Sequence, residues 1–233
     1  ESTGLAESTK KTYLNHVRHL YSWAEFFNKD LQNLSIKEII EYKTQLKKIY
    51  ADSTINNKLS AVRNFYDYLI QVDIVSSNVV FNSLFITMDK IRPQFLSEDD
   101  REKLINYLSS KGQHVQLAFN IMMYAGLRLS EVTEIKIKDL EFREEKAYIH
   151  VYDFKTNKLR LCPVFSTQTA SDIKEQMKNK MLGDKLFELA PRTLQHYAKE
   201  FADNYNIKFT VHTCRHIYAT DRVRKGIRIE LLK

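Results

Sequence analysis

Two arginines stand in apolar segments that lie far apart in the sequence. Arg128 follows a glycine in AGLRLSE, at residues 125–131, directly after an apolar run. Arg215 comes three residues after His212 in VHTCRHIYAT, at residues 211–220. Arginine suits phosphate because its planar fork donates two hydrogen bonds, and histidine transfers protons near neutral pH. These residue types predict a phosphate site with proton transfer.

Each arginine also has an ordinary structural explanation. Gly126 is suited to end the preceding helix in a left-handed conformation, which would place Arg128 at the next helix start, where backbone amides favour anions. Taken alone, Arg128 is also explained by an ion pair with Glu131. His212 and Arg215 are three apart on a predicted helix and therefore share a face. A phosphate site requires these segments to converge.

A third group of cations lies in YDFKTNKLRLCPV, at residues 152–164. Apolar and polar residues alternate on both sides of KTNK, which predicts two strands joined by a turn. Lys155, Lys158 and Arg160 surround that turn. A lysine there would be able to reach into a DNA groove, and the alternative is a solvated hairpin tip.

The second motif also invites a zinc interpretation, because His212 and His216 are four residues apart with Cys214 between them. Cys214 falls off the face that the two histidines share, and no glutamate follows His212, as it would in a helical zinc motif. We therefore expect no metal.

The elements that position these motifs are mainly helical. Apolar residues at helical spacing predict helices over residues 8–28, 35–50, 53–71, 97–110, 113–125, 167–180, 191–205 and 213–225, with short helices near 78–87 and after Arg128. Two β-rich stretches within 142–164 predict one small antiparallel sheet. Residues 89–100 hold the first proline and are typical of a linker. We expect a four-helix domain, 1–92, and an α-rich domain with the sheet, 93–233.

Composition and charge point to a polyanionic partner. The chain has 233 residues and a formal net charge of +7, spread over both predicted domains. Two cysteines without paired spacing predict no disulfide framework and suit a reducing cytoplasm. The apolar runs are too short to span a membrane, and no signal peptide is evident at the start. Two basic domains would be able to close around a DNA duplex, although two ordinary solvated domains would carry similar charge.

The third predicted helix, 53–71, offers a polar face for DNA. That face carries Asn56, Asn57, Lys58, Ser60 and Arg63. Asparagine and arginine suit base edges, and lysine suits phosphate, so we assign Asn56, Asn57, Lys58 and Arg63 to DNA binding. Lys10, Lys11, Lys158 and Arg160 are assigned to the same partner. The alternative for the helix is a solvated face without a ligand.

In this order and spacing the motifs resemble the tyrosine recombinases, or phage integrases, which include Xer recombinases and conjugative-transposon integrases. GLRLSE is similar to the first box of that family. KTNKLRLCPV resembles its hairpin, with Thr156 in place of a glycine and Cys162 in place of a valine. HTCRHIYAT resembles its second box, with Cys214 for leucine and Tyr218 for phenylalanine. The N-terminal helices resemble the family's SAM-like core-binding domain.

The resemblance implies a site-specific recombinase that cleaves DNA through a 3′-phosphotyrosine intermediate, without ATP, metal or other cofactor. Arg128 and Arg215 would hold the scissile phosphate, Lys155 would protonate the leaving 5′-oxygen, and His212 would assist proton transfer. Glu131 would brace the fold. His216 would pack or support its neighbours. The protein would act in the cytoplasm, at the nucleoid, as a dimer or tetramer on a double-stranded recombination site.

The chain departs from the family pattern in one respect. The nucleophilic tyrosine normally follows the second box, but the only tyrosine after His212 is Tyr218, at a core position of the box. We therefore expect a chain that is truncated before its nucleophile, and that binds DNA without cleaving it. The alternatives are a type IB topoisomerase-like enzyme and a non-catalytic DNA-binding regulator.

Overall fold

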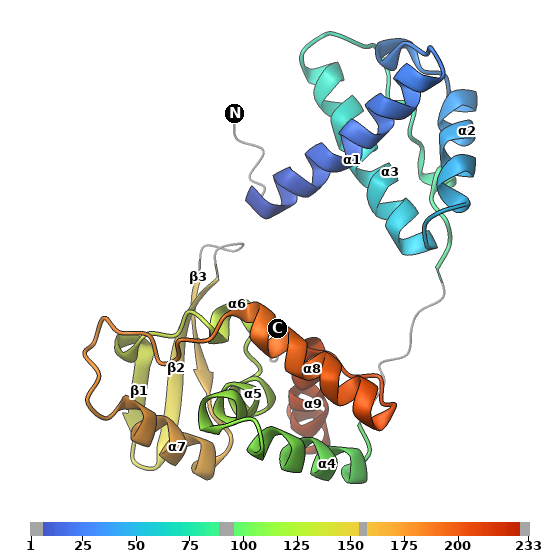
Figure 1. Ribbon diagram of the computed structural model, residues 1–233. Helices are drawn as coiled ribbons and strands as arrows, with labels where there is room; N and C mark the ends of the chain where they lie inside the picture. The colour runs from blue at the N-terminus through green and yellow to red at the C-terminus, as the bar shows by residue number, and fades with distance from the viewer. Residues whose placement is uncertain (1–6, 89–95, 154–157, 229–233) are drawn as a thin grey trace. The chain divides into compact units, whose positions relative to one another are not determined.

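The computed structural model describes residues 7–88, 96–153 and 158–228, and the chain is mainly helical with one small sheet (Figure 1). It divides into two compact units, Glu1–Ile91 and Arg92–Lys233. Each unit has its own hydrophobic core. The predicted fold class, helical with a small antiparallel sheet, is confirmed.

Three α-helices and a 3-10 turn build most of the N-terminal unit: α1 (Glu7–Phe26), η1 (Leu31–Asn33), α2 (Ile36–Lys47) and α3 (Asp52–Gln71). The start of α2 is fixed by a capping box, in which the Ser35 amide donates to a Glu38 carboxylate oxygen at 2.8 Å and the Glu38 amide donates to Ser35 Oγ at 3.3 Å. Both α1 and α2 pack on α3, and Leu20, Tyr42 and Tyr66 are buried between them.

The fourth helix predicted near residues 78–87 is wrong. The segment contains only the short 3-10 turn η2 (Asn82–Leu84), flanked by extended residues Phe81 and Phe85. The Asn78 side chain accepts a hydrogen bond from the Val80 amide at 2.8 Å and donates to the Arg63 carbonyl at 2.9 Å. Asparagine side chains compete with helix formation in this way, so the apolar residues pack from an extended chain instead.

The C-terminal unit places a buried helix at its centre. Its elements are α4 (Glu98–Ser109), α5 (Gln113–Ala125), α6 (Leu129–Val132), η3 (Ile137–Asp139), β1 (Leu140–Arg143), β2 (Lys146–Asp153), β3 (Lys158–Pro163), α7 (Thr167–Met177), α8 (Pro191–Tyr205) and α9 (Val211–Arg224). The central helix α5 packs against α4, α7 and α9 (Figure 1). Because α5 contacts α9, the segments that follow α5 are brought towards the second motif.

The sheet has three antiparallel strands in the order β1-β2-β3, one more than the predicted pair. The additional strand pairs Leu140 with Ile149 and Arg143 with Lys146, and turns through Glu144 at φ 54°. This strand, LEFR, has only four residues, which is too short for an alternation of apolar and polar residues to be recognised in the sequence. The predicted β2–β3 pair is confirmed, and the turn between them, residues 154–157, lies outside the described residues.

The predicted left-handed end of α5 is confirmed at Gly126, where φ is +69°. A Cβ atom at this position would lie 2.5, 2.7 and 2.9 Å from ring atoms of Tyr218. The half-buried Tyr218 ring lies between α5 and Phe165, whose ring centroid is 6.2 Å away. Tyr218 therefore faces inward, as predicted, and locks α9 against the turn that precedes Arg128.

We predict that Gly126→Ala lowers the free energy of unfolding by at least about 2 kcal/mol, because it adds a clash with Tyr218 to the strain of a positive φ. Urea denaturation measures the loss. Gly112→Ala is the control, because Gly112 has φ +99° and nothing within 4 Å of its added Cβ. An equal loss in both variants would show that Tyr218 does not constrain the turn.

Candidate active site

Three arginines from separate elements meet at one carboxylate. Arg128, at the start of α6, donates its backbone amide to Glu131 Oε2 at 2.6 Å and its Nη1 to Glu131 Oε1 at 2.7 Å. Arg160, on β3, donates Nη2 to Oε2 at 2.6 Å. Arg215, on α9, places Nη1 3.9 Å from the same oxygen. We call these four residues the arginine cluster.

The packing of α5 against α9 explains why Arg128 and Arg215 converge. The chain turns at Gly126, directly after α5, so Arg128 follows three residues after the last residue of that helix. Arg215 reaches this turn from α9 and donates Nη1 to the Gly126 carbonyl. The two motif arginines are therefore joined through the turn as well as through Glu131, as the phosphate hypothesis requires.

The electrostatics of the cluster favour an anion. Burial acts to raise the pKa of Glu131, but hydrogen bonds from Arg128 and the charge of Arg160 hold that pKa below its ordinary value. Burial and the nearby charge of Arg128 lower the pKa of Arg215. Three guanidinium groups around one carboxylate leave an excess of positive charge, and guanidinium groups bind phosphate through strong, directional hydrogen bonds.

The other two predicted catalytic residues, His212 and Lys155, are not part of the arginine cluster as the structure describes it. His212 lies on α9, three residues before Arg215, and is exposed. Lys155 lies outside the described residues. His216 is exposed, which contradicts the first of its two expected roles, packing, whereas support of its neighbours stays a prediction. It lines a small pocket together with Arg101 and Asp221, whose Nη2 and Oδ2 are 2.6 Å apart.

The structure places Arg160, which the sequence assigns to DNA, in the arginine cluster, a position that the sequence analysis does not predict. The alternation of β3 contains a signal for it. Arg160 shares a face with buried Cys162, whereas Leu159 and Leu161 are exposed. Neighbouring residues of a strand point to opposite faces, so Arg160 faces the core side of the sheet. Lys158, two residues earlier at the strand start, is exposed.

Two of the residues predicted to read DNA from α3 are structural, and those assignments are corrected. Asn56 Nδ2 donates to the Ile86 carbonyl at 2.9 Å, and its Oδ1 accepts from the Ile86 amide at 2.9 Å. Lys58 is 5% exposed, with Nζ 4.6 Å from the ring centroid of Tyr50, and burial lowers its pKa. Both side chains have partners inside the domain: Lys58 is buried, and Asn56 is bonded to both backbone groups of Ile86.

The remaining predicted DNA residues stay predictions. Asn57 is exposed on α3. Arg63 is half-buried and donates Nη1 to Asn82 Oδ1. On α1, Lys11 is exposed, and Lys10 pairs with Glu7 at 2.7 Å while remaining 40% exposed.

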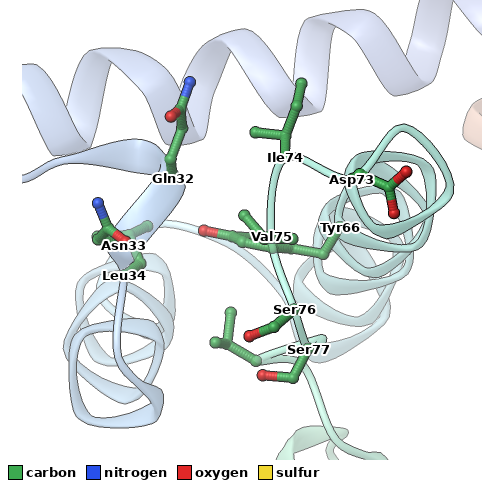
Figure 2. Close-up of a pocket in the computed structure, with 10 residues that line it drawn as sticks. Gln32, Asn33, Leu34, Tyr66, Asp73, Ile74, Val75, Ser76 and Ser77 are labelled. Carbon is green, nitrogen blue, oxygen red and sulfur yellow. The ribbon is translucent and has the colours of Figure 1, made fainter.

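A pocket of about 630 Å³ lies in the N-terminal unit, whereas the arginine cluster belongs to the C-terminal unit. Figure 2 shows Gln32, Asn33 and Leu34 on one side of it and Ser76 and Ser77 on the other. The one charged residue in its lining is an aspartate, so the pocket does not suit a phosphate.

Two absences hold for residues 7–88, 96–153 and 158–228. Within these ranges no group of three or more His, Cys, Asp or Glu side chains is placed to hold a metal ion. No helix in the same ranges combines the length and apolar character needed to cross a bilayer.

We predict that Glu131→Gln lowers the free energy of unfolding at about pH 7 by about 2–3 kcal/mol, because it leaves partly buried arginines without their carboxylate. The folded pKa of Glu131 lies below its ordinary value of 4.5. The carboxylate therefore stabilises the fold above that value, and the contribution is lost as the pH falls through the folded pKa.

Urea denaturation at about pH 7 and at about pH 4 measures this pH dependence. The difference between wild type and Glu131→Gln should narrow at the lower pH. Glu134→Gln is the control, because Glu134 pairs with Lys185 at 2.8 Å but is 65% exposed. A difference that is constant with pH would contradict an ionised Glu131.

We also predict that alanine substitutions at two neighbouring asparagines of α3 affect different properties, stability at Asn56 and DNA sequence preference at Asn57. Asn56→Ala should cost about 1–2 kcal/mol of stability, because it leaves two Ile86 backbone groups without partners. Asn57→Ala should change stability by less than about 0.5 kcal/mol but weaken sequence preference in selections from a random duplex library. Unchanged preference in Asn57→Ala would remove this residue from the DNA surface.

Comparison with known proteins identifies two matching domain families. Residues 94–233 match the phage integrase family, and residues 1–75 match the phage integrase N-terminal SAM-like domain. A tyrosine recombinase from Pseudothermotoga lettingae is 28% identical, over 98% of this chain and 82% of the relative. The tyrosine recombinase XerA from Saccharolobus solfataricus is 24% identical, over 99% of this chain and 78% of the relative.

Solved structures show the same fold. A lambda integrase dimer bound to a COC′ core site has a TM-score of 0.77 at 16% identity, covering 98% of this chain and 86% of that one. The Tn1549 transposon integrase in complex with circular intermediate DNA has a TM-score of 0.74 at 17% identity, covering 98% and 85%. The motif arginines, the fold and the two domain matches agree, and this chain belongs to the phage integrase family.

Proposed function

We propose that this protein is a site-specific DNA recombinase that acts on double-stranded DNA through a 3′-phosphotyrosine intermediate. The observation that carries the proposal is the convergence of Arg128 and Arg215. They come from motifs 87 residues apart in sequence and meet at Glu131 and the Gly126 carbonyl. Two fixed cations at one point suit a single backbone phosphate, because they stabilise the charge that grows on its oxygens during exchange.

The chemistry is a phosphoryl exchange that conserves the number of ester bonds. A tyrosine oxygen attacks the phosphorus, and the bond to the 5′-oxygen breaks. Lys155 gives that oxygen its proton, and His212 assists proton transfer. The 5′-hydroxyl of a partner strand then attacks the phosphotyrosine and releases the tyrosine. The bond energy is held in the covalent intermediate, so the exchange needs no nucleotide hydrolysis.

Tyr218 has the surroundings of a packing residue rather than a nucleophile. Its ring lies against Gly126 and Phe165, and the guanidinium carbon of Arg222 is 5.9 Å from the ring centroid. Burial raises the pKa of its hydroxyl, which disfavours the phenolate. We therefore assign the nucleophile to a tyrosine other than Tyr218.

The proposal extends to assembly and location. Similar folds have been solved as a lambda integrase dimer on a core site and as a lambda integrase tetramer on a Holliday junction. We propose that this chain likewise acts as a dimer or tetramer on its recombination site, in the cytoplasm at the nucleoid. The net charge of +7 supports a DNA partner.

We predict that the protein binds duplex DNA with an affinity that falls steeply as salt rises, because each phosphate contact releases counterions. Arg128→Ala and Arg215→Ala should each reduce the slope of log affinity against log salt by roughly one phosphate contact. Fluorescence anisotropy with a labelled duplex measures the slope.

Arg143→Ala is the control. Its guanidinium, on the other edge of the sheet, pairs with Glu141 at 2.6 Å, and the variant loses the same charge. Affinity that stays flat with salt would contradict the proposal.

A suicide duplex tests the tyrosine assignment, because a covalent adduct that Tyr218→Phe abolishes would make Tyr218 the nucleophile.

A further inference from the structure

Arg160 contacts the carboxylate that both motif arginines approach. This inference rests on the proposed function. Its Nη2 lies 2.6 Å from Glu131 Oε2, and its side chain is 27% exposed. The same oxygen accepts the Arg128 amide at 2.6 Å and lies 3.9 Å from Arg215 Nη1. Arg160 therefore holds the one atom that both motif arginines share.

The orientation of Glu131 depends on which groups hold each of its oxygens. Arg128 contacts both oxygens, through its backbone amide and its Nη1. Those two bonds come from a residue only three positions away, so they fix Glu131 within its own turn. The bond from Arg160 comes from β3, 29 residues along the chain. It is the contact that fixes the carboxylate relative to the sheet.

The burial of Arg160 is costly for a purely stabilising residue. Its Nε is buried and has no hydrogen-bond partner among the residues that the structure describes. An unpartnered buried donor costs about 1–3 kcal/mol, and well-packed apolar residues often stabilise as well as a buried ion pair. An arginine in this place is better explained by what its fork positions.

Arg160 also connects the arginine cluster to the β2–β3 hairpin. Its strand begins at Lys158, three residues after Lys155 in the sequence. Arg160 pairs across the sheet with Val151, and its neighbour Cys162 with Ile149, both of which are buried. Strand β3 is thus fixed by its pairing with buried residues of β2 and by the hydrogen bond from Arg160 to Glu131.

We propose that Arg160 is a positioning residue, which fixes Glu131 between the sheet and α9 and thereby sets Arg128 and Arg215 for one phosphate. Direct DNA contact by Arg160, as we first expected from the sequence, is the competing explanation. The two explanations differ in one expectation. If Arg160 acts through Glu131, its removal no longer affects DNA binding once Glu131 is replaced, whereas direct DNA contact by Arg160 would still contribute to binding.

The first arm of the test uses the DNA-free protein. Side-chain ¹⁵N NMR of the guanidinium groups reports the surroundings of Arg128 and Arg215. Arg160→Ala should shift both resonances, Arg160→Lys should shift them less, and Arg143→Ala should shift neither. Urea denaturation identifies any variant that fails to fold, and Arg160→Lys keeps the test open in that event. Unchanged Arg128 and Arg215 resonances in folded Arg160→Ala would overturn the proposal.

The second arm is a double-mutant cycle in duplex binding at fixed salt. Arg160→Ala alone should weaken binding roughly tenfold, well beyond Arg143→Ala, which loses the same charge. In a Glu131→Gln background, Arg160→Ala should have almost no further effect. A full additional loss there, with the salt slope reduced by about one, would establish direct phosphate contact instead. Wild-type protein that binds no duplex would refute the proposed function. The NMR measurement would still decide whether Arg160 positions Arg128 and Arg215, because it uses the DNA-free protein.

Discussion

The site depends on one carboxylate that is shared by three guanidinium groups. Glu131 is only 11% exposed, and it accepts hydrogen bonds from Arg128 and Arg160 while Arg215 lies 3.9 Å away. Arginines placed so closely would repel one another without a negative charge among them. The largely buried carboxylate makes their proximity stable, yet leaves enough positive charge to hold an anion.

The fold meets that requirement with few parts. Helix α5 ends at a glycine that accepts the ring of Tyr218 from α9, and this contact seats Arg215 against the same turn that leads to Arg128. The sheet supplies Arg160 from a third direction. Residues distant in sequence thus converge because α6 and α9 both pack on α5, while Arg160 reaches Glu131 from β3.

The sequence could predict that Arg128 and Arg215 meet, but not which side chains and backbone groups hold the individual polar residues. Helical spacing and glycine placement predicted the ends of α5 and the inward side of Tyr218, because both follow from local geometry. The partners of Asn56 and Lys58 could not be predicted in the same way, and for Arg160 the alternation of β3 indicates the face of the sheet but not the partner. Each depends on a partner distant in sequence: Ile86, the Tyr50 ring or Glu131. A polar residue on a helix or strand looks the same whether it faces DNA or a buried backbone group.

The central claim is that one backbone phosphate occupies the space between Arg128 and Arg215. A crystal structure of the protein with a short duplex carrying its recombination site tests it most directly. We predict a single phosphate that accepts hydrogen bonds from both guanidinium groups, with Glu131 still held by Arg160. A duplex whose phosphates contact other residues, while Arg215 remains bound only to the Gly126 carbonyl, would contradict the account.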